Sequence, residues 1–165
     1  MSNIKNIPTI TEPDVQKVRS AMHHRAQWLY LILDEAEKAG LNIEDAARLA
    51  MGRCGCFQGA GLREDCTDPE DLASFAEVFA DPDFMKYFEM EMVEANRDRM
   101  QIRFHHCPLV AGWQAIGCSD EQIQRLCDIA MDGDRGIAKV CGYRLTLGDT
   151  IAKGGCVCDI TFTKE

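Results

Sequence analysis

The sequence lacks any long apolar segment and is short of positive charge. No hydrophobic run approaches the roughly 18 residues that a membrane-spanning helix requires. Lysine and arginine number 18 against 27 aspartates and glutamates, which gives a net charge of −9. Because nucleic acids and anionic lipids attract basic surfaces, this balance argues against both kinds of partner. The first residues also lack the basic start and apolar stretch of a secretory signal, so we expect a cytoplasmic protein.

Common functional signatures are absent as well. The glycine-rich stretch Gly52–Gly61 carries neither a nucleotide-binding P-loop nor a dinucleotide-binding pattern. The 165 residues contain no internal repeat, and 46% of them are hydrophobic and 27% charged. These values are typical of a globular chain that is long enough to form a core. We expect one compact domain over 1–165, with a helical region at 1–87 and a hairpin, a helix and two closing strands at 88–165.

Cysteine, in contrast, is abundant. An odd number of cysteines excludes complete internal pairing, and a reducing compartment disfavours disulfides in any case. The thiols are therefore expected to be inert buried side chains, metal ligands or a reactive thiolate. The nine residues are Cys54, Cys56, Cys66, Cys107, Cys118, Cys127, Cys141, Cys156 and Cys158.

The first half of the chain has helical periodicity. A helix is expected from Thr11, as its cap, to Gly40, and Asn42 should cap a second helix. The four glycines between residues 52 and 61 should weaken this second helix. Two further helices are expected to start at the Asp-Pro pairs 68–69 and 81–82, because proline favours the first helical position.

The pattern changes to strands near residue 88. Apolar and polar residues alternate over 88–95 and 99–106, and residues 96–98 can form the turn of a hairpin, although a helix over 83–96 is an alternative. Ser119 should cap a later helix, an acidic loop is expected at 132–136, and closing strands at about 138–147 and 156–163. This order predicts an α+β fold, with N-terminal helices packed on an antiparallel sheet of about four strands and inserted helices.

The end of the predicted hairpin carries the densest chemistry. His105 and His106 must point to opposite faces of the strand, and the alternation from Met100 to Phe104 places His106 on the inner side. Cys107 follows, and a cysteine beside an imidazole can be a thiolate nucleophile at neutral pH. The alternative interpretation is a core cysteine next to an exposed histidine.

Acidic residues and further cysteines supply other candidates. Asp128 follows Cys127 near the end of the helix that Ser119 caps, and Asp132 and Asp134 come next, where a solvated acidic turn is the alternative.

Two Cys-x-Cys pairs are a separate feature of the sequence. Cys54 with Cys56 and Cys156 with Cys158 could together form a four-thiolate zinc or iron–sulfur site, although the usual spacing is Cys-x2-Cys. On the last strand, Asp159 must face away from Cys158.

Short motifs in the second half of the chain match those of a known family. They are His106-Cys107-Pro108 at the strand end, a following helix with Gly117, Leu126-Cys127-Asp128, the Thr146-Leu147 strand, and Gly155-x2-Cys158-Asp159-Ile160. Through these motifs, residues from about 88 to the end resemble the L-2-amino-thiazoline-4-carboxylic acid hydrolase family. The family usually has phenylalanine where this chain has Ile160, and Cys156 is an additional thiol.

The resemblance implies hydrolytic opening of a cyclic amidine to a carbamoyl-cysteine, with a small, anionic, amino-acid-like substrate. We therefore expect Cys107 to attack the ring carbon, or to bind a metal that delivers water to it. His106 would set the protonation state of Cys107. The sequence motifs identify neither a metal nor a cofactor.

The other expected site residues act on the proton or on the substrate. Asp128 or Asp159 would serve as the general base or orient the imidazole, and Arg103 or Arg144 would hold the substrate carboxylate. Cys127 and Cys158 are expected to line the same site.

Two other functions fit the same residues. The closing glycine–cysteine strand is also similar to 4-vinyl reductase type domains, which implies a non-enzymatic module that binds a small molecule or a metal. In a third interpretation the cysteines are inert and the long first helix binds a partner. Val15, Met22, Trp28 and Leu31 are candidates for that helix face and are consistent with a homodimer.

Overall fold

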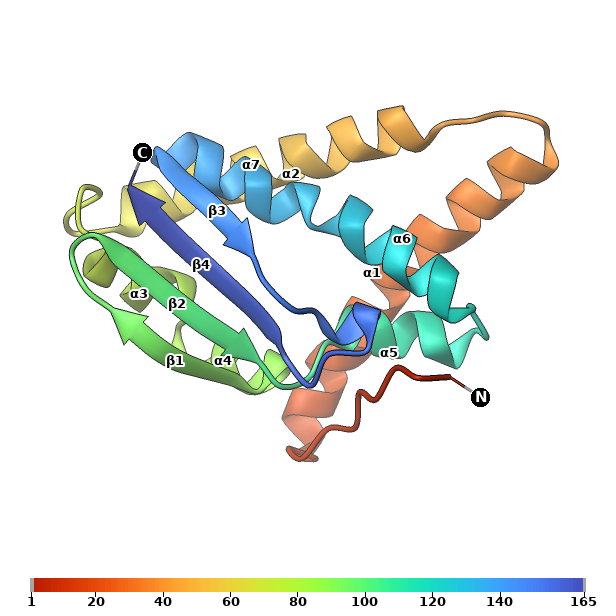
Figure 1. Cartoon of the computed structure of the whole chain (residues 1–165), viewed down its shortest axis with the longest axis horizontal. Coiled ribbons are helices and arrows are strands. Elements are labelled where there is room, and N and C mark those ends of the chain that lie inside the picture. The colour runs from red at the N-terminus through yellow and green to blue at the C-terminus, as the bar shows by residue number, and fades with distance from the viewer. Residues whose placement is uncertain (1, 165) are drawn as a thin grey trace.

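The computed structural model describes residues 2–164, which form an antiparallel sheet and a set of helices (Figure 1). This organisation confirms the predicted α+β class. The elements are α1 (Pro13–Lys38), α2 (Glu44–Asp65), α3 (Leu72–Phe79), α4 (Pro82–Phe88), β1 (Met90–Ala95), β2 (Arg99–Phe104), α5 (Pro108–Ala115), α6 (Asp120–Ala130), α7 (Asp132–Cys141), β3 (Tyr143–Leu147), the 3-10 turn η1 (Ile151–Lys153) and β4 (Cys158–Lys164).

The sheet has the strand order β1-β2-β4-β3, with every neighbouring pair antiparallel. β1 and β2 form the predicted hairpin, and the register shifts between Met92 and Glu94, which leaves Val93 as a bulge. The last strand, β4, lies between β2 and β3, so that Ile102 pairs with Ile160. The last strand of the chain therefore lies in the middle of the sheet and not at an edge.

The two faces of the sheet have different environments. Met100, Ile102, Ile160 and Phe162 point toward the helices and are fully buried. α3 and α4 lie behind this face in Figure 1, and the Phe75 ring of α3 lies 5.5 Å from the Phe162 ring, centroid to centroid. Arg103, Asp159 and their neighbours point to the opposite face, because side chains alternate along a strand. The predicted inner position of the even-numbered β2 residues is confirmed.

Glycines hold α2 and α7 in direct backbone contact. A Cβ atom on Gly55 would lie 1.8 Å from the carbonyl oxygen of Gly133, and one on Gly136 would lie 2.3 Å from that of Gly52. The glycines were expected to weaken the second helix, but α2 continues to Asp65 because they allow α7 to pack against it. The predicted acidic loop at 132–136 is wrong for the same reason, since these residues form the first turns of α7.

Several predicted boundaries shift. Glu12, not Thr11, is the N-cap of α1, and α3 begins at Leu72 after its cap Asp71 rather than at the first Asp-Pro pair. α4 does begin at the second pair, with Asp81 as its cap. The closing strands are shorter than predicted, because residues 138–141 end α7 and β4 begins at Cys158. Ser119 caps α6 through the predicted capping box with Gln122.

The described part of the chain before α1 is neither helix nor strand. Figure 1 shows this segment, in dark red, running below α5 toward the start of α1. Ile4 is nevertheless buried in the core, together with Leu33 of α1 and Trp113 of α5. None of the helices formed by residues 2–164 combines the length and apolar character of a membrane-spanning helix.

Candidate functional site

The alternation of the two central strands divides the predicted site residues between two places. Cys158 faces the helical side and is buried, whereas Asp159 faces the open side of the sheet. On β2 the same rule sends Arg103 to the open side, and His106, just beyond the strand, is 2% exposed on the inner side. The residues that were expected to form one site are therefore separated by the sheet.

On the inner side, the three cysteines of the resemblance motifs come together. Cys107 is the N-cap of α5, Cys127 lies on α6, and Cys158 begins β4. Their sulfur atoms are close enough for a charge on Cys107 to raise the pKa of both Cys127 and Cys158. Cys107 and Cys127 are partly exposed, whereas Cys158 is buried. We call these three residues the thiol cluster.

Asp134 of α7 is a carboxylate within electrostatic range of the thiol cluster. Its negative charge raises the pKa of all three thiols. Burial in turn raises the pKa of Asp134 to about 6, although its own backbone amide, Arg135 and Arg25 act in the opposite direction. No other hydrogen bond holds this carboxylate within residues 2–164. It is thus a carboxylate of raised pKa within electrostatic range of three sulfur atoms.

Asp134 was predicted to lie in a loop at the unfavourable C-terminal end of a helix. In the structure a second helix starts there, so Asp132 and Asp134 lie in the first turn of α7. Negative charge is favourable at a helix N-terminus, which explains the acidic composition of this segment. The run of acidic residues was visible in the sequence. Its interpretation as the start of a helix required knowing that α7 begins there.

The environment of Cys107 differs from that of the other two thiols. Burial raises the pKa of Cys107, while the amides of Val110 and Leu109 in the first turn of α5 lower it. The Cys107 sulfur, however, accepts no capping hydrogen bond of ordinary geometry from these amides. Burial raises the pKa of Cys127 to about 12 and raises that of Cys158 further. Of the three sulfur atoms, that of Cys107 lies at a helix N-terminus, where the first-turn amides favour the thiolate.

Two cations border the thiol cluster. Arg25 of α1 lowers the pKa of both Cys107 and Asp134, and Lys153 of η1 lowers that of Cys127. Both side chains are exposed, and neither forms an ion pair with another residue in the described range 2–164. A small anion at the cluster would therefore have two unneutralised cations beside it.

His106 lies in a different group of buried polar side chains. Burial, together with the charges of Arg19 and His23, lowers the pKa of His106 to about 4, although Glu89 and a backbone hydrogen bond with Asn6 oppose this. Its Nδ1 atom is buried without a hydrogen-bond partner. The imidazole is thus neutral at pH 7, and its strongest charged neighbours are not those of the Cys107 sulfur.

The other predicted acidic residues have partners that hold them elsewhere. Asp128, next to Cys127, forms ion pairs of 2.9 Å with Arg48 and with Arg135 near the protein surface. Asp159 accepts a hydrogen bond from Arg103 at 3.0 Å on the open face of the sheet. These contacts suit structural ion pairs.

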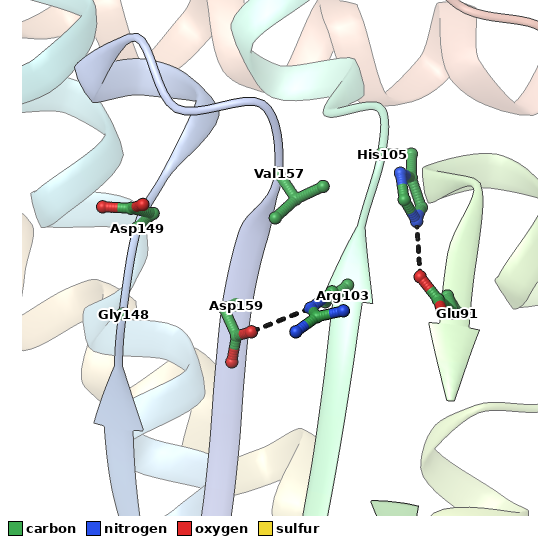
Figure 2. Close-up of a pocket in the computed structure, with 7 residues that line it drawn as sticks. All are labelled: Glu91, Arg103, His105, Gly148, Asp149, Val157 and Asp159. Atoms are coloured by element: carbon green, nitrogen blue, oxygen red, sulfur yellow. Dashed lines mark hydrogen bonds and ion pairs between the residues drawn. The ribbon is translucent and has the colours of Figure 1, made fainter. Parts of the chain in front are cut away.

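A hollow of about 440 Å³ lies on the open face, where the predicted residues Arg103 and Asp159 meet (Figure 2). Figure 2 shows their ion pair next to a hydrogen bond of 2.9 Å between His105 Nε2 and Glu91. The expected Arg144 lies on β3 opposite Thr163 and is not part of the lining. The full lining is Glu91, Arg103, His105, Gly148, Asp149, Val157 and Asp159.

The hypothesis of a four-thiolate metal site is wrong for the part of the chain that the structure describes. Cys54 and Cys56 lie on α2, whereas Cys158 begins β4 and Cys156 lies two residues before it. Within residues 2–164 no group of three or more His, Cys, Asp or Glu side chains is arranged to hold a metal ion.

Comparison with known proteins identifies a family and a solved structure of similar fold. The structure is subunit 3 of a trafficking protein particle complex from Naegleria fowleri, covalently bound to palmitic acid. It has a TM-score of 0.56 and 13% sequence identity, over 88% of this chain and 95% of that one, so the two share a fold. None of the curated proteins matches this chain.

The family match covers the N-terminal helices as well as the motifs of the second half. The family model for L-2-amino-thiazoline-4-carboxylic acid hydrolase aligns with residues 19–162. It thus includes α1 from residue 19 onward, Arg25 and the thiol cluster in one match. The chain belongs to the L-2-amino-thiazoline-4-carboxylic acid hydrolase family.

Proposed function

We propose that this protein hydrolyses a C–N bond of a cyclic amidine that carries a carboxylate, as the name of its family suggests. One observation carries the proposal: the cysteines of three separate sequence motifs lie within electrostatic range of one another and of one carboxylate, Asp134. Three helices and a strand supply these residues, and a core needs no such convergence of thiols with an unpaired carboxylate. The amidine would therefore bind at the thiol cluster.

In this mechanism Cys107 is the nucleophile and Asp134 moves the proton. Asp134 accepts the thiol proton as sulfur attacks the amidine carbon, and returns it to the ring nitrogen as the C–N bond breaks. Water then adds to the same carbon, and the bond from carbon to the Cys107 sulfur breaks. This releases the carbamoyl product. The water oxygen becomes its carbonyl oxygen, and the two water protons go to the nitrogen that remains on the carbon and, through Asp134, to the Cys107 thiolate.

The protonation states favour this division of roles. A thiol with a raised pKa is largely protonated at pH 7 and needs a base beside it. A carboxyl group with a pKa of about 6 is roughly nine-tenths ionised at pH 7, yet it is a stronger base than an ordinary aspartate. Asp134 therefore has the pKa that a general base needs near neutral pH.

The exposed cations at the thiol cluster account for the charge of the substrate. Arg25 and Lys153 have no competing ion pair within residues 2–164, and either can bind the substrate carboxylate. We assign this role to Arg25 and Lys153 in place of Arg103 and Arg144. Arg103 is already paired with Asp159, and Arg103 and Arg144 both lie on the strands of the sheet, apart from the thiol cluster.

The proposal is tested with L-2-amino-thiazoline-4-carboxylate under reducing conditions, with mass spectrometry of the ring-opened product. Cys107→Ala and Asp134→Asn should lower turnover at least a hundredfold. Asp128→Asn is the matched control, since this nearby carboxylate is engaged by two arginines and should retain most of the activity. Equal activity of all variants would contradict the proposed site. Loss of activity with a chelator would instead assign Cys107 to a metal-ligand role.

A binding module without catalysis is the second candidate. It is favoured by the raised pKa of all three thiols, which keeps them protonated and unreactive. This function predicts that the same compound raises the melting temperature of the protein without being consumed. Turnover by the wild type that Cys107→Ala abolishes would exclude it.

A further inference from the structure

Residues 2–10 are tied to the rest of the protein at both ends, although they form no helix or strand. We call them the N-terminal strap. At its start, Ser2 Oγ and the Asn3 amide donate to Asp120 of α6 at 2.6 and 2.8 Å. At its end, the amides of Thr9 and Ile10 donate to the carboxylate of Glu89 at 2.7 and 2.9 Å. The strap is therefore part of the folded domain.

Asn6, in the middle of the strap, bonds the backbone of Cys107 on both sides. Its Nδ2 donates to the Cys107 carbonyl oxygen at 2.8 Å, and its Oδ1 accepts from the Cys107 amide at 2.8 Å. Asn6 is 8% exposed, so water does not compete freely for these groups. The Asn6 side chain thus bonds the backbone of Cys107 as a neighbouring strand would, beyond the end of β2.

Cys107 needs this support because the chain changes structure there. It is extended, with φ −122° and ψ 109°, between the last residues of β2 and the first turn of α5. Its carbonyl also accepts the Ala111 amide at 3.1 Å, which is the first helical hydrogen bond of α5. Its backbone direction therefore sets how the sulfur lies relative to the amides of Leu109 and Val110.

From these contacts we propose that Asn6 is a positioning residue for the Cys107 thiol. The proposal rests on the proposed function, since it assigns Asn6 a part in the same reaction. Asn6 holds the N-cap conformation in which the helix amides lower the pKa of Cys107. The Asn6 backbone also acts on the His106 imidazole, whose pKa it raises, so that one strap residue lies next to both members of the His-Cys pair.

The chemistry of an amide side chain is what this role requires. Asparagine supplies one donor and one acceptor, which match the carbonyl and amide of a single residue. Aspartate has the same shape but only acceptors, so it would leave the Cys107 carbonyl with the Ala111 amide as its remaining donor and place a negative charge near the thiol. Asn6→Asp should therefore raise the pKa of Cys107 as well as loosen its backbone.

The experiment measures how fast iodoacetamide alkylates Cys107 as a function of pH, with peptide mass spectrometry to separate the nine thiols. Asn6→Asp should shift the Cys107 profile upward by at least one pH unit and lower kcat/KM at least tenfold. Thr9→Val is the matched control, because it removes the 2.7 Å bond from Thr9 Oγ1 to Glu89 in the same strap. It should leave the Cys107 profile unchanged.

The outcomes separate positioning from mere stability. Identical Cys107 profiles in the wild type and Asn6→Asp would overturn the proposal, whatever the melting temperatures. Asn6→Ser replaces Asn6→Asp where the latter does not fold, since a hydroxyl can bond only one of the two Cys107 groups well. If the wild type does not hydrolyse the amidine, the proposed function fails. The alkylation profile still decides whether Asn6 positions the thiol.

Discussion

The carbonyl oxygen of Gly133 lies 1.8 Å from the position that a Cβ atom of Gly55 would occupy, so α2 and α7 touch through their backbones. This contact is one residue from Asp134, the carboxylate of the candidate site. Gly59 makes a similar approach to Ile137 one turn further along both helices, with a Cβ distance of 2.9 Å. The glycines of α2 thereby fix the position of α7 along α2 and its rotation about its own axis. They also fix the position of Asp134.

Alanine at Gly55 should destabilise the protein strongly. The new methyl group would overlap backbone that cannot move aside without shifting α7, and we expect a loss of about 3 kcal/mol of unfolding free energy. Gly61→Ala on the same helix has nothing within 4 Å of its Cβ position and should stabilise by up to about 1 kcal/mol. Urea unfolding of both variants checks the prediction, and similar midpoints would refute the tight helix contact.

The activity should depend on the ionisation of Asp134. A general base works only in its deprotonated form, so kcat/KM should rise with pH through the pKa of Asp134, which is about 6. Asp134→Asn should remove this acid limb together with most of the rate. A pH–rate profile of the wild type that is flat between pH 5 and 7 would argue against Asp134 as the base.

Glu89 should contribute stability that acid removes. Burial would raise the pKa of Glu89, but hydrogen bonds from Ile10, Thr9 and Arg19 outweigh it and lower the pKa below the usual value. Its contribution is therefore present above about pH 4.5 and is lost as the pH falls through the lowered pKa. Glu89→Gln should cost about 3 kcal/mol at pH 7, because it leaves Arg19 buried without a counter-charge.

The measurement for Glu89 is urea unfolding at pH 7 and pH 3. The wild type should lose more stability than Glu89→Gln between these two values, since only the carboxylate has a proton to gain. Lys17→Ala is a control on the same helix as Arg19, because its ion pair with Asp14 is exposed and should contribute less than about 1 kcal/mol. Equal losses in the wild type and Glu89→Gln would be inconsistent with this explanation.

His106 should also make the fold sensitive to acid, in a higher pH range. Its pKa is about 4 in the folded protein and 6.5 when unperturbed, so the unfolded chain binds the proton first. Stability should therefore rise between about pH 4 and pH 6.5, by at most about 3 kcal/mol from this group. His106→Phe removes the titrating group, and a smaller change in unfolding free energy over this range is expected. A variant with the wild-type slope would disprove the assignment.

Local patterns in the sequence predicted much of the fold. The hairpin, its turn and the inward position of His106 followed from the period-two alternation between residues 99 and 106. The capping box of Ser119 was also readable, because it depends on two residues three positions apart. The start of α7 was not, because Gly133 and Gly136 disfavour a helix until α2 packs against them.

The candidate site was predicted only in part. Cys107, Cys127 and Cys158 were expected to share a site, and they do come together. Asp128 and Asp159 were preferred to Asp134, because sequence proximity to a cysteine does not reveal which ion pairs already hold a carboxylate. Asn6 could not be found at all, since it lies about a hundred residues from Cys107 in the chain and carries no motif.

The sequence by itself determined the α+β class, the family and the identity of the clustered cysteines. Those features depend on local periodicity and on short motifs, which are properties of neighbouring residues. Only the tertiary structure decided that the sheet separates Asp159 from Cys158, that Asp134 lies within electrostatic range of the thiols and that Asn6 holds Cys107. These relationships depend on contacts between residues distant in sequence, and the packing of α7 on α2 and of the strap beneath α5 produces them.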